Sequence, residues 1–324
     1  MNRLSLSLAA CLVFCLTPFV HSQERPPATP LITHNPYFSV WSFTDRLTDS
    51  DTVHWTGTAQ PMVGLARIDG KTYRFMGSNP KRLPAMDQTV HTVRATHTIY
   101  EFRQGGVTLR FVFFTPAFVN DLDVLSRPVT YLTWTAQSND GAAHDVSVLL
   151  DVDPVIAVND RSERVVLTRN RTASLDVLSA GSQDQRILNR SGDNLRIDGG
   201  QCHRAAPKDE QVQTSLAPDA IENFTWNGQL PERDAMGMPE LPERGSAHLD
   251  AVVGFGKVGS AAVERHLLVA YTQDFAIQYL ERNLRPYWQR NKMPVAEMLD
   301  MAEQQYPALE KQGVPCSPYV TVTE

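Results

Sequence analysis

The chain has few of the features that would assign a function directly. Its 324 residues include only four cysteines, and 30 lysines and arginines stand against 36 aspartates and glutamates, for a net charge of −6. A nucleic-acid binder needs a basic face to neutralise phosphates, so we expect no nucleic-acid partner. With 42% apolar and 20% charged residues, the composition also excludes collagen-like, coiled-coil and wholly disordered chains. Small molecules or proteins remain as partners.

Long apolar runs are lacking except at the N-terminus. A positive start at Arg3 is followed by an apolar stretch from Leu4 to Val20, and Ser22 ends a segment that a signal peptidase would cleave. The pattern predicts a signal peptide over residues 1–22 and a secreted or periplasmic protein. The residues leading to Cys11 also spell a lipoprotein signal, which is the alternative. The run is short for a transmembrane helix, so we expect no membrane span.

Cysteine is nearly absent beyond this segment. Only Cys202 and Cys316 follow the predicted signal peptide. In an oxidising compartment they could pair in a disulfide, and two unpaired thiols are the alternative. Neither belongs to a Cys-x-x-Cys motif, so we expect no redox site.

Motifs for cofactors, metals and common nucleophiles are also missing. There is no Gly-x-Ser-x-Gly elbow, Walker loop or His-Glu-x-x-His helix motif. The glycines of 254–259 spell G-x-G-x-x-G, but the segment after them is too short for the helix of a dinucleotide site, which favours a glycine-rich β-turn. His91 and His97, six residues apart on one predicted strand, would share a face, and we interpret them as solvated rather than zinc-binding. We expect no cofactor and no metal.

What is present is a long series of strand-like segments. Residues 62–68 and 71–75 flank Asp69-Gly70, a spelling typical of a type I′ hairpin turn. Residues 90–102 and 107–114 follow, and a further hairpin is predicted from 129–135 and 145–150 around Asn139-Asp140-Gly141. Two more apolar strands are expected at 249–255 and 266–271. Strands at this spacing, with no helical pattern between them, predict a mainly β fold, an antiparallel β-sandwich of the supersandwich type.

Two regions depart from this pattern. Residues 204–244 are rich in proline and charge and predict a long surface loop with one short helix near 218–224. Residues 275–280 could begin a helix that Pro286 interrupts, and apolar residues recur at helical spacing from Pro294 to Lys311. We expect an amphipathic C-terminal helix, with Met298, Leu299 and Leu309 exposed for want of a partner.

Two groups of residues are candidates for a site. Tyr37, Trp41, Asp45, His54 and Trp55 gather aromatic, imidazole and carboxylate groups in a polar stretch, as ligand-binding loops do, although Phe38, Val40 and Trp41 could instead be core residues of a first strand. We take Trp41, Asp45, His54 and Trp55 as candidate ligand contacts.

Asp151 and Asp153 form the second group, because two carboxylates on one strand face suit acid–base hydrolysis. They are weaker candidates, since aspartates at strand ends commonly accept hydrogen bonds from backbone donors.

Several of these segments together resemble the secreted glutaminase A family. The resemblance covers most of the chain after the signal peptide, at residues 30–42 (PLITHNPYFSVWS), 54–57 (HWTG), 67–70 (RIDG), 75–77 (FMG), 277–279 (IQY) and 284–288 (LRPYW). It implies an N-terminal β-sandwich followed by an all-α toroid of the six-hairpin glycosidase type. The implied activity is hydrolysis of L-glutamine to L-glutamate and ammonia.

The chain also departs from the family pattern. Residues 314–324 do not continue into the toroid, and the family's Trp-Gly-Tyr is missing after the aspartate in Arg196-Ile-Asp-Gly-Gly. We therefore expect a chain without the all-α domain, inactive alone, with no catalytic residue carried over. The predicted division is a signal peptide (1–22), an N-terminal family segment (23–80), the β-sandwich (81–285) and a truncated helical linker (286–324).

The predicted role is the non-catalytic N-terminal portion of a glutaminase-like hydrolase. It would meet a small-molecule substrate only together with the missing all-α domain, which a separate chain could supply by docking. Two alternatives stay open: a carbohydrate-binding module that stacks sugars on Trp41, Trp55 and Tyr37, and a fragment of a six-hairpin glycoside hydrolase.

Overall fold

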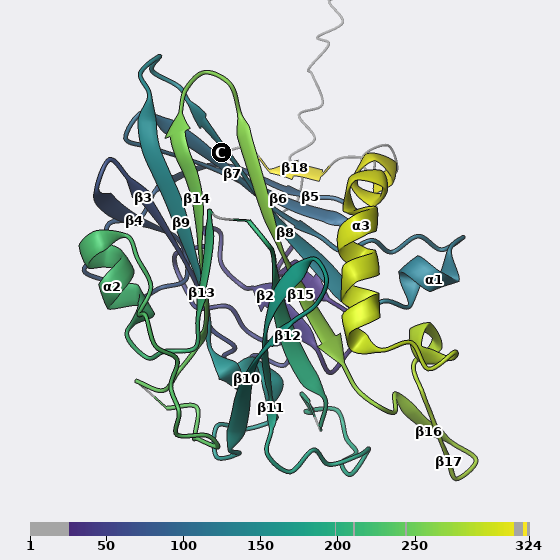
Figure 1. Ribbon diagram of the computed structural model, residues 1–324. Coiled ribbons are helices and arrows are strands. Elements are labelled where there is room, and N and C mark those ends of the chain that lie inside the picture. Colours follow the sequence, from purple (N-terminus) through teal and green to yellow (C-terminus); the bar gives the residue numbers. More distant parts are fainter. Residues whose placement is uncertain (1–25, 198, 210, 244, 314–319, 323–324) are drawn as a thin grey trace, which may run out of the picture.

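The computed structural model describes residues 26–313 apart from 198, 210 and 244, together with the backbone of residues 320–322. The predicted signal peptide lies outside the described residues. Two antiparallel sheets pack face to face, and a helix covers part of each outer surface (Figure 1). The predicted mainly β sandwich is confirmed.

Within the described residues, the larger layer is a nine-stranded sheet, called the large sheet here. Its strands, in spatial order, are β10 (Val165–Arg171), β11 (Leu175–Ser182), β12 (Gln201–Pro207), β15 (Val263–Thr272), β8 (Val129–Ser138), β7 (Val107–Phe114), β6 (His97–Gln104), β5 (Asp87–Val93) and β18 (Val320–Val322).

The second layer, the small sheet, has five strands among the described residues. The strands of the small sheet are, in spatial order, β13 (Val212–Ser215), β14 (Leu249–Val258), β9 (His144–Val152), β3 (Met62–Ile68) and β4 (Lys71–Met76). Strands β3 and β4 precede residue 81, so part of the segment predicted as 23–80 is built into the sandwich.

The remaining elements connect or cover the sheets. They are the hairpins β1 (Thr29–Thr33) with β2 (Ser39–Ser42) and β16 (Ile277–Tyr279) with β17 (Arg282–Leu284), the helices α1 (Leu122–Leu125), α2 (Ala220–Asn227) and α3 (Val295–Gly313), and the short 3-10 helices η1 (Pro154–Ala157) and η2 (Tyr287–Gln289).

Alternation along the strands creates the core between the sheets. On β7 and β8, Phe111 and Trp134 point inward and stack with ring centroids 4.8 Å apart, while Val112 and Tyr131 point to the opposite face. Apolar side chains of β3, β9 and β14 meet them from the small sheet. Because successive side chains of a strand point to opposite faces, both faces of the large sheet are apolar and both must be covered.

The hairpin predicted around Asp69-Gly70 is confirmed. β3 and β4 pair from Ile68 opposite Lys71, and Asp69 and Gly70 both have positive φ, 48° and 83°. These angles are those of a type I′ turn, in which glycine is unstrained.

The predicted hairpin of residues 129–150 is wrong in its pairing. β8 lies between β15 and β7 in the large sheet, whereas β9 lies between β14 and β3 in the small sheet. The turn at residues 139–141 therefore carries the chain from one layer to the other. β14 and β15 are related in the same way, so two pairs of consecutive strands tie the layers together at this end.

The glycines of residues 254–259 are mainly strand, not turn. Gly254 and Gly256 belong to β14, and a β-bulge between them shifts the pairing with β9. Gly256 has a φ of 65°, which glycine adopts without strain. No helix follows the motif before β15, which agrees with the rejection of a dinucleotide site.

The two histidines predicted to share a strand face lie on opposite faces. The backbone turns at residues 94–96, so His91 belongs to β5 and His97 to β6. On the face of the large sheet that points into the sandwich, His91 stacks on Tyr100 with ring centroids 4.5 Å apart. On the outer face, His97 stacks on Phe114 with ring centroids 4.3 Å apart. Both are buried rather than solvated.

The segment predicted as a long loop over 204–244 is more ordered than expected. It begins inside β12, contains β13, and carries the expected short helix as α2. Arg204 is fully buried. The strand β12 was concealed because its buried side chains include His203 and Arg204 beside the small apolar Ala205 and Ala206.

The C-terminal helix is confirmed, but its predicted exposure is wrong. Met298, Leu299 and Leu309 of α3 are buried against the outer face of the large sheet, as Figure 1 shows for the helix as a whole. Tyr131 on β8 donates to the carbonyl oxygen of Ala302 at 2.8 Å. The chain's own sheet is therefore the partner of the helix. The helix expected from residue 275 is instead the hairpin β16–β17.

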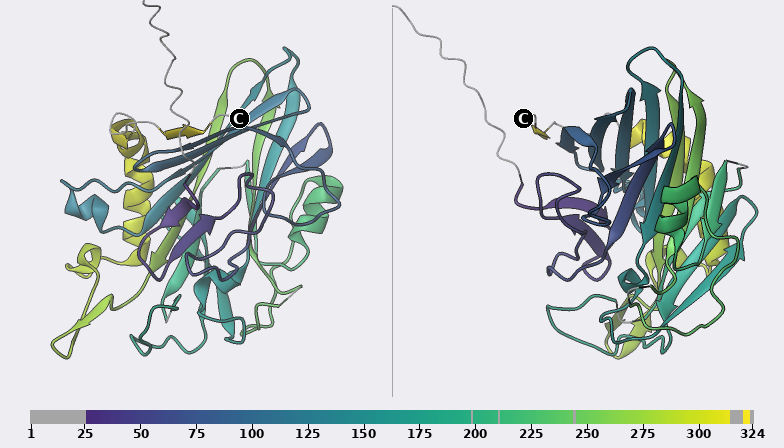
Figure 2. Two further views of the ribbon diagram at one scale, coloured as in Figure 1. Left: turned by 180° about the vertical axis from the view of Figure 1, so that it is seen from behind. Right: turned by 90° about the vertical axis from the view of Figure 1, so that its left-hand side faces the viewer.

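The N-terminal hairpin closes the side of the sandwich that faces away from the viewer in Figure 1, and it is drawn in purple in Figure 2. Phe38 stacks on Tyr271 of β15 with centroids 4.9 Å apart, and Ile32 and Val40 are fully buried in the same core. Thr98 of β6 donates to the Pro30 carbonyl at 2.7 Å. The hairpin is thus part of the sandwich core.

Asp300 fixes α3 to the turn between β10 and β11. Its carboxylate accepts hydrogen bonds from the hydroxyls of Thr172 and Ser174, both at 2.5 Å, and from the backbone N–H groups of Ala173 and Ser174 at 3.1 and 3.0 Å. Burial opposes its charge, but these donors outweigh burial and lower the pKa of Asp300. The ionised form is therefore what holds the turn.

We expect Asp300→Ala to lower the free energy of unfolding by about 2–3 kcal/mol, because the turn loses a charged acceptor for four donors. Urea denaturation at pH 7 measures this. Glu297→Ala, an exposed change on the same helix, is the matched control and should shift stability by less than about 0.5 kcal/mol. Equal effects of the two changes would contradict the anchoring role.

Candidate functional site

The aromatic residues near the N-terminus form a surface over the hairpin β1–β2. Trp41 on β2 exchanges backbone hydrogen bonds with Val53 at 2.7 and 2.9 Å, which places the loop carrying Trp55 beside it. Phe38 and Val40 are core residues, whereas Trp41 is half-buried and Trp55 is 44% exposed. The core interpretation is therefore confirmed for Phe38 and Val40, and ligand contact by Trp41 and Trp55 stays a prediction.

His54 holds two loops together and does not reach solvent. Its Nε2 lies 3.0 Å from the Pro36 carbonyl oxygen, and its Nδ1 lies 2.9 Å from Thr56 Oγ1. Trp55 Nε1 donates to the same Pro36 oxygen at 2.7 Å. Burial lowers the pKa of His54 against the opposing effect of that carbonyl, so the ring is neutral at pH 7. His54 therefore has a structural role, because it holds the loop that carries Trp55 against Pro36.

A hollow of about 340 Å³ opens between these loops. Trp41 and Trp55 line it together with Thr33, His34, Asn35, Pro36 and Ser39 of the hairpin β1–β2. Burial lowers the pKa of His34 to about 3, so this imidazole is also neutral. The hollow offers ring faces and neutral polar groups, which suits contact with a ligand or a protein surface rather than proton transfer.

Asp45 does not line this hollow. It is exposed in the loop after β2, where its carbonyl oxygen accepts from Gln88 Nε2 at 2.9 Å. The structure thus brings together Trp41, Trp55 and, behind them, His54, but not Asp45.

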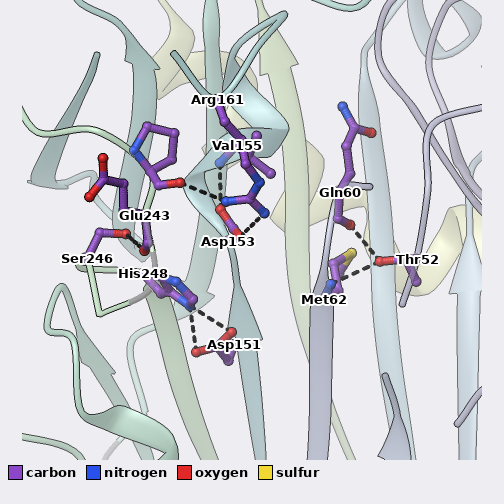
Figure 3. A network of polar contacts seen from close by, with 11 residues as sticks. Thr52, Gln60, Met62, Asp151, Asp153, Val155, Arg161, Glu243, Ser246 and His248 are labelled. Atoms are coloured by element: carbon purple, nitrogen blue, oxygen red, sulfur yellow. Dashed lines mark hydrogen bonds and ion pairs between the residues drawn. The ribbon is translucent and has the colours of Figure 1, made fainter. Parts of the chain in front are cut away.

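The candidate carboxylates are buried and have separate partners (Figure 3). Both oxygens of Asp151 lie 2.9 Å from Nδ1 of His248. Asp153 lies beyond the end of β9, accepts the Val155 N–H at 2.9 Å as the cap of η1, and pairs with Arg161 at 2.6 Å. Asp153 therefore accepts a backbone hydrogen bond, as expected for an aspartate at the end of a strand. Asp151 and Asp153 do not form a pair of carboxylates that is open to solvent.

A buried charge cluster surrounds Asp151. Asp250 on β14 lies directly opposite it in the sheet, and Arg204 donates to the Asp250 carbonyl oxygen. Burial, together with the Asp151 charge, raises the pKa of Asp250 well above its usual value. Burial opposes the charge of His248, but the Asp151 carboxylate outweighs it and raises the pKa of His248 to about 10. At pH 7 His248 therefore carries its proton and is not a free general base.

Three members of this cluster were missed by sequence reasoning. They share no sequence motif. His248 directly precedes β14, Asp250 lies on β14, and Arg204 lies on β12. One signal was available for Asp250, because a carboxylate inside the apolar run 249–253 must find a buried partner. His248 and Arg204 offered no such signal, since His248 meets Asp151 through the pairing of β14 with β9, and Arg204 reaches the cluster from the other sheet.

Arg196 was also missed as a link between the two candidate regions. Its Nη1 donates to Thr58 Oγ1 at 2.9 Å in the aromatic loop, and its Nε donates to the Asn159 carbonyl at 2.6 Å beyond Asp153. The loops at this end of the sandwich are thus braced by one buried side chain.

Cys202 lies in the core between the sheets. It is fully buried, and burial raises the pKa of its thiol to about 12, so it is unreactive as a thiol. Cys316 lies outside the described residues, and the suggested pairing stays a prediction.

No metal-binding cluster of three or more His, Cys, Asp or Glu side chains is found among the residues that the structure describes. In the same part of the chain, none of the helices combines the length and the apolar character that crossing a membrane requires.

Comparison with known proteins places this fold in a family. The chain belongs to the family described as "Domain of unknown function (DUF5127)", which matches residues 96–314, and a second family, "Domain of unknown function (DUF4964)", matches residues 6–86. It is similar to Glutaminase A of Aspergillus oryzae, with 32% identity over 165 residues, which are 48% of this chain and 24% of that protein. The chain thus spans about a quarter of the relative that it matches. The resemblance to the glutaminase A family is confirmed, and the family is related to hydrolases.

Two solved structures are more distant. The chain matches "Putative kojibiose phosphorylase from human microbiome" with a TM-score of 0.41 and 9% identity, over 87% of this chain and 33% of that one. It matches a heparan sulfate lyase HepC mutant from Pedobacter heparinus with a TM-score of 0.24 and 9% identity, over 59% of this chain and 22% of that one. Likenesses at these scores say nothing further about this chain.

The His248–Asp151 pair should make stability depend on pH. The folded state keeps the His248 proton up to about pH 10, whereas the unfolded chain releases it near pH 6.5. The stabilisation is therefore complete below pH 6.5 and is lost as pH rises toward 10. We expect His248→Ala to cost about 3–5 kcal/mol at pH 7, because Asp151 stays buried without its cation.

Urea denaturation between pH 6.5 and 10 tests this expectation. The His248→Ala variant should lose part of the decline that the unmodified chain shows over this range. His34→Gln is the control, since His34 is neutral throughout the range and its replacement should leave the slope unchanged. A slope that His248→Ala does not alter would overturn the assignment.

A second pair of substitutions separates the roles of His54 and Trp55. We expect His54→Ala to lower the free energy of unfolding by about 1–3 kcal/mol, because two loops lose a buried hydrogen-bonded link. Trp55→Ala, at a half-exposed position, should cost less. Chemical denaturation monitored by circular dichroism compares them, and a His54→Ala variant as stable as the unmodified chain would contradict the structural role.

Proposed function

We propose that this chain is the non-catalytic β-sandwich portion of an exported, glutaminase-A-like hydrolase. In this proposal residues 1–22 direct export, the sandwich acts as a scaffold, and an all-α domain supplies the catalytic groups. The assembled protein would hydrolyse the side-chain amide of L-glutamine to give L-glutamate and ammonia. The sequence relationship to Glutaminase A supports the choice of reaction.

The observation that carries the non-catalytic role is the state of the candidate carboxylates. Asp151 and Asp153 are 4% and 7% exposed, and each is paired with a cation of the same chain. A general acid or base must come within hydrogen-bond reach of the substrate, and these groups lie beneath the loops. Both ring nitrogens of His54 have partners within the chain, Pro36 and Thr56, and Nδ1 of His248 is paired with Asp151.

The surface for an all-α domain is the hairpin β16–β17 rather than the helix α3. The apolar face of α3 is already buried against the large sheet. The hairpin, in contrast, exposes Ile277 (55%), Tyr279 (61%) and Leu280 (79%), a set of apolar side chains that marks an interaction surface in a soluble protein. The hairpin also carries one of the sequence segments that resemble the glutaminase A family.

The aromatic hollow is the second part of this proposal. Trp41 and Trp55 present ring faces to solvent on a loop system that Arg196 and His54 hold in place. We propose that these loops border the substrate entrance of the assembled protein. The contribution is contact with the substrate, since the hollow holds no group that can move a proton at pH 7.

An ammonia-release assay tests whether the β-sandwich chain is non-catalytic and depends on an all-α domain for activity. The purified chain should release no ammonia from L-glutamine above the blank, and release should begin when a separately produced all-α domain of the glutaminase A family is added. Oligosaccharides assayed in parallel distinguish a glycoside hydrolase. Ammonia release by the chain alone would overturn the non-catalytic role.

A substitution in the hairpin β16–β17 tests whether this hairpin is the docking surface. Leu280→Asp should weaken association with the all-α domain about tenfold or more, because it places a charge in an apolar contact. Ile187→Asp, also at an exposed apolar position (51%), is the control and should leave association unchanged. Equal effects of both variants would contradict the assignment of the hairpin.

A further inference from the structure

The outer face of the small sheet carries a groove beside α2, on the other side of the sheet from the core. Its volume is about 650 Å³. Strand register places Arg67 of β3 opposite Ser147 of β9, and Ser147 opposite Gly254 of β14. Gln213 of β13 lies opposite Val252 of β14. The groove therefore crosses four adjacent strands.

Small residues create the hollow in this face. Ser147 and Gly254 occupy neighbouring positions on the two central strands, whereas further along the same face Leu149 and Val252 pack under Phe224 of α2. A Cβ atom at position 254 would lie 3.2 Å from Gln211 Oε1. The face is thus covered by the helix at one end and left open at the other.

Side-chain amides dominate the walls of the groove. Gln211 and Gln213 come from β13 and the residues before it, and Asn227 and Gln229 follow from the end of α2. Gln213 Nε2 donates to Gln229 Oε1 at 2.5 Å, which ties the two walls together. Each amide carries both donors and acceptors, the combination that matches hydroxyl groups.

The charged residues of the groove balance one another. Arg67 and Lys257 face Asp69 and Asp145, and Lys257 lies 3.8 Å from Asp145. The Asp69 carboxylate is also held by His144 at 2.6 Å. A groove without net charge does not select a phosphate or a sulfated ligand. A neutral ligand fits it better.

The Arg67 side chain lies against the end of α2, at one wall of the groove. Arg67 Nε is buried and has no hydrogen-bond partner within the described part of the chain. Its Nη2 donates to the Trp226 carbonyl oxygen at 3.5 Å, so the guanidinium lies near the end of α2.

An exposed tryptophan stands next to the groove in the chain. Trp226 immediately precedes the wall residue Asn227, and its side chain is 85% exposed. A tryptophan this exposed is unusual on a soluble protein, and its ring face is the surface on which a sugar ring packs. The wall amides and an exposed indole are thus neighbours in the chain at the end of α2.

We propose that this groove binds a neutral oligosaccharide. The wall amides would bond its hydroxyl groups, and Trp226 would contact a ring at the rim. The site lies on the small sheet and shares no lining residue with the hollow of Trp41 and Trp55. It does not depend on the reaction proposed above.

Isothermal titration of the full chain with five neutral hexasaccharides tests the proposal: maltohexaose, cellohexaose, xylohexaose, mannohexaose and chitohexaose. We expect at least one to bind with a Kd between about 10 µM and 1 mM. Gln213→Ala and Trp226→Ala should each weaken that binding about tenfold, and Met236→Ala, at a side chain that is 93% exposed, should leave it unchanged.

Thermal unfolding of each variant shows that the fold is kept, which is expected because Trp226 is exposed. Failure of all five sugars to bind at about 10 mM would overturn the proposal. Binding that is lost in Trp55→Ala but kept in Gln213→Ala and Trp226→Ala would also overturn it, by assigning the sugar to the aromatic hollow. Neither outcome depends on ammonia release, so the groove and the hydrolase proposal can fail separately.

Discussion

The fold depends on the burial of both faces of the large sheet. Its central strands alternate between two apolar sets, one facing the small sheet and the other facing outward. An exposed apolar sheet face of this size would aggregate, so the outer set must be covered. The helix α3 meets this requirement, held by Asp300 at one end and by hydrogen bonds from β8 along its length.

This constraint determines which surfaces remain for function. Because α3 is occupied by its own sheet, partner contacts must come from elsewhere. The β16–β17 hairpin, the hollow over β1–β2 and the groove on the small sheet are three surfaces that α3 leaves uncovered. They lie on separate elements, so substrate contact, domain docking and glycan binding can be tested apart.

The end of the sandwich near β9 and η1 shows how burial changes the meaning of a carboxylate. Asp151 in isolation could serve as an acid or base, but beside Asp250, His248 and Arg204 it becomes one charge of a closed network. Such networks cost free energy unless every partner is present. Here the His248–Asp151 pair joins the start of β14 to β9, and the loops around the hollow are braced separately by His54 and Arg196.

The sequence by itself determined the sandwich class, the Asp69-Gly70 hairpin and the C-terminal helix, because these depend on local periodicity and turn chemistry. It also suggested Trp41 and Trp55 as surface groups. Only the tertiary structure decided that residues 129–150 cross between layers, that α3 packs on its own sheet, and that His248, Asp250 and Arg204 meet Asp151. Each of these depends on contacts between distant strands, and the register that produces them leaves no signal in local sequence.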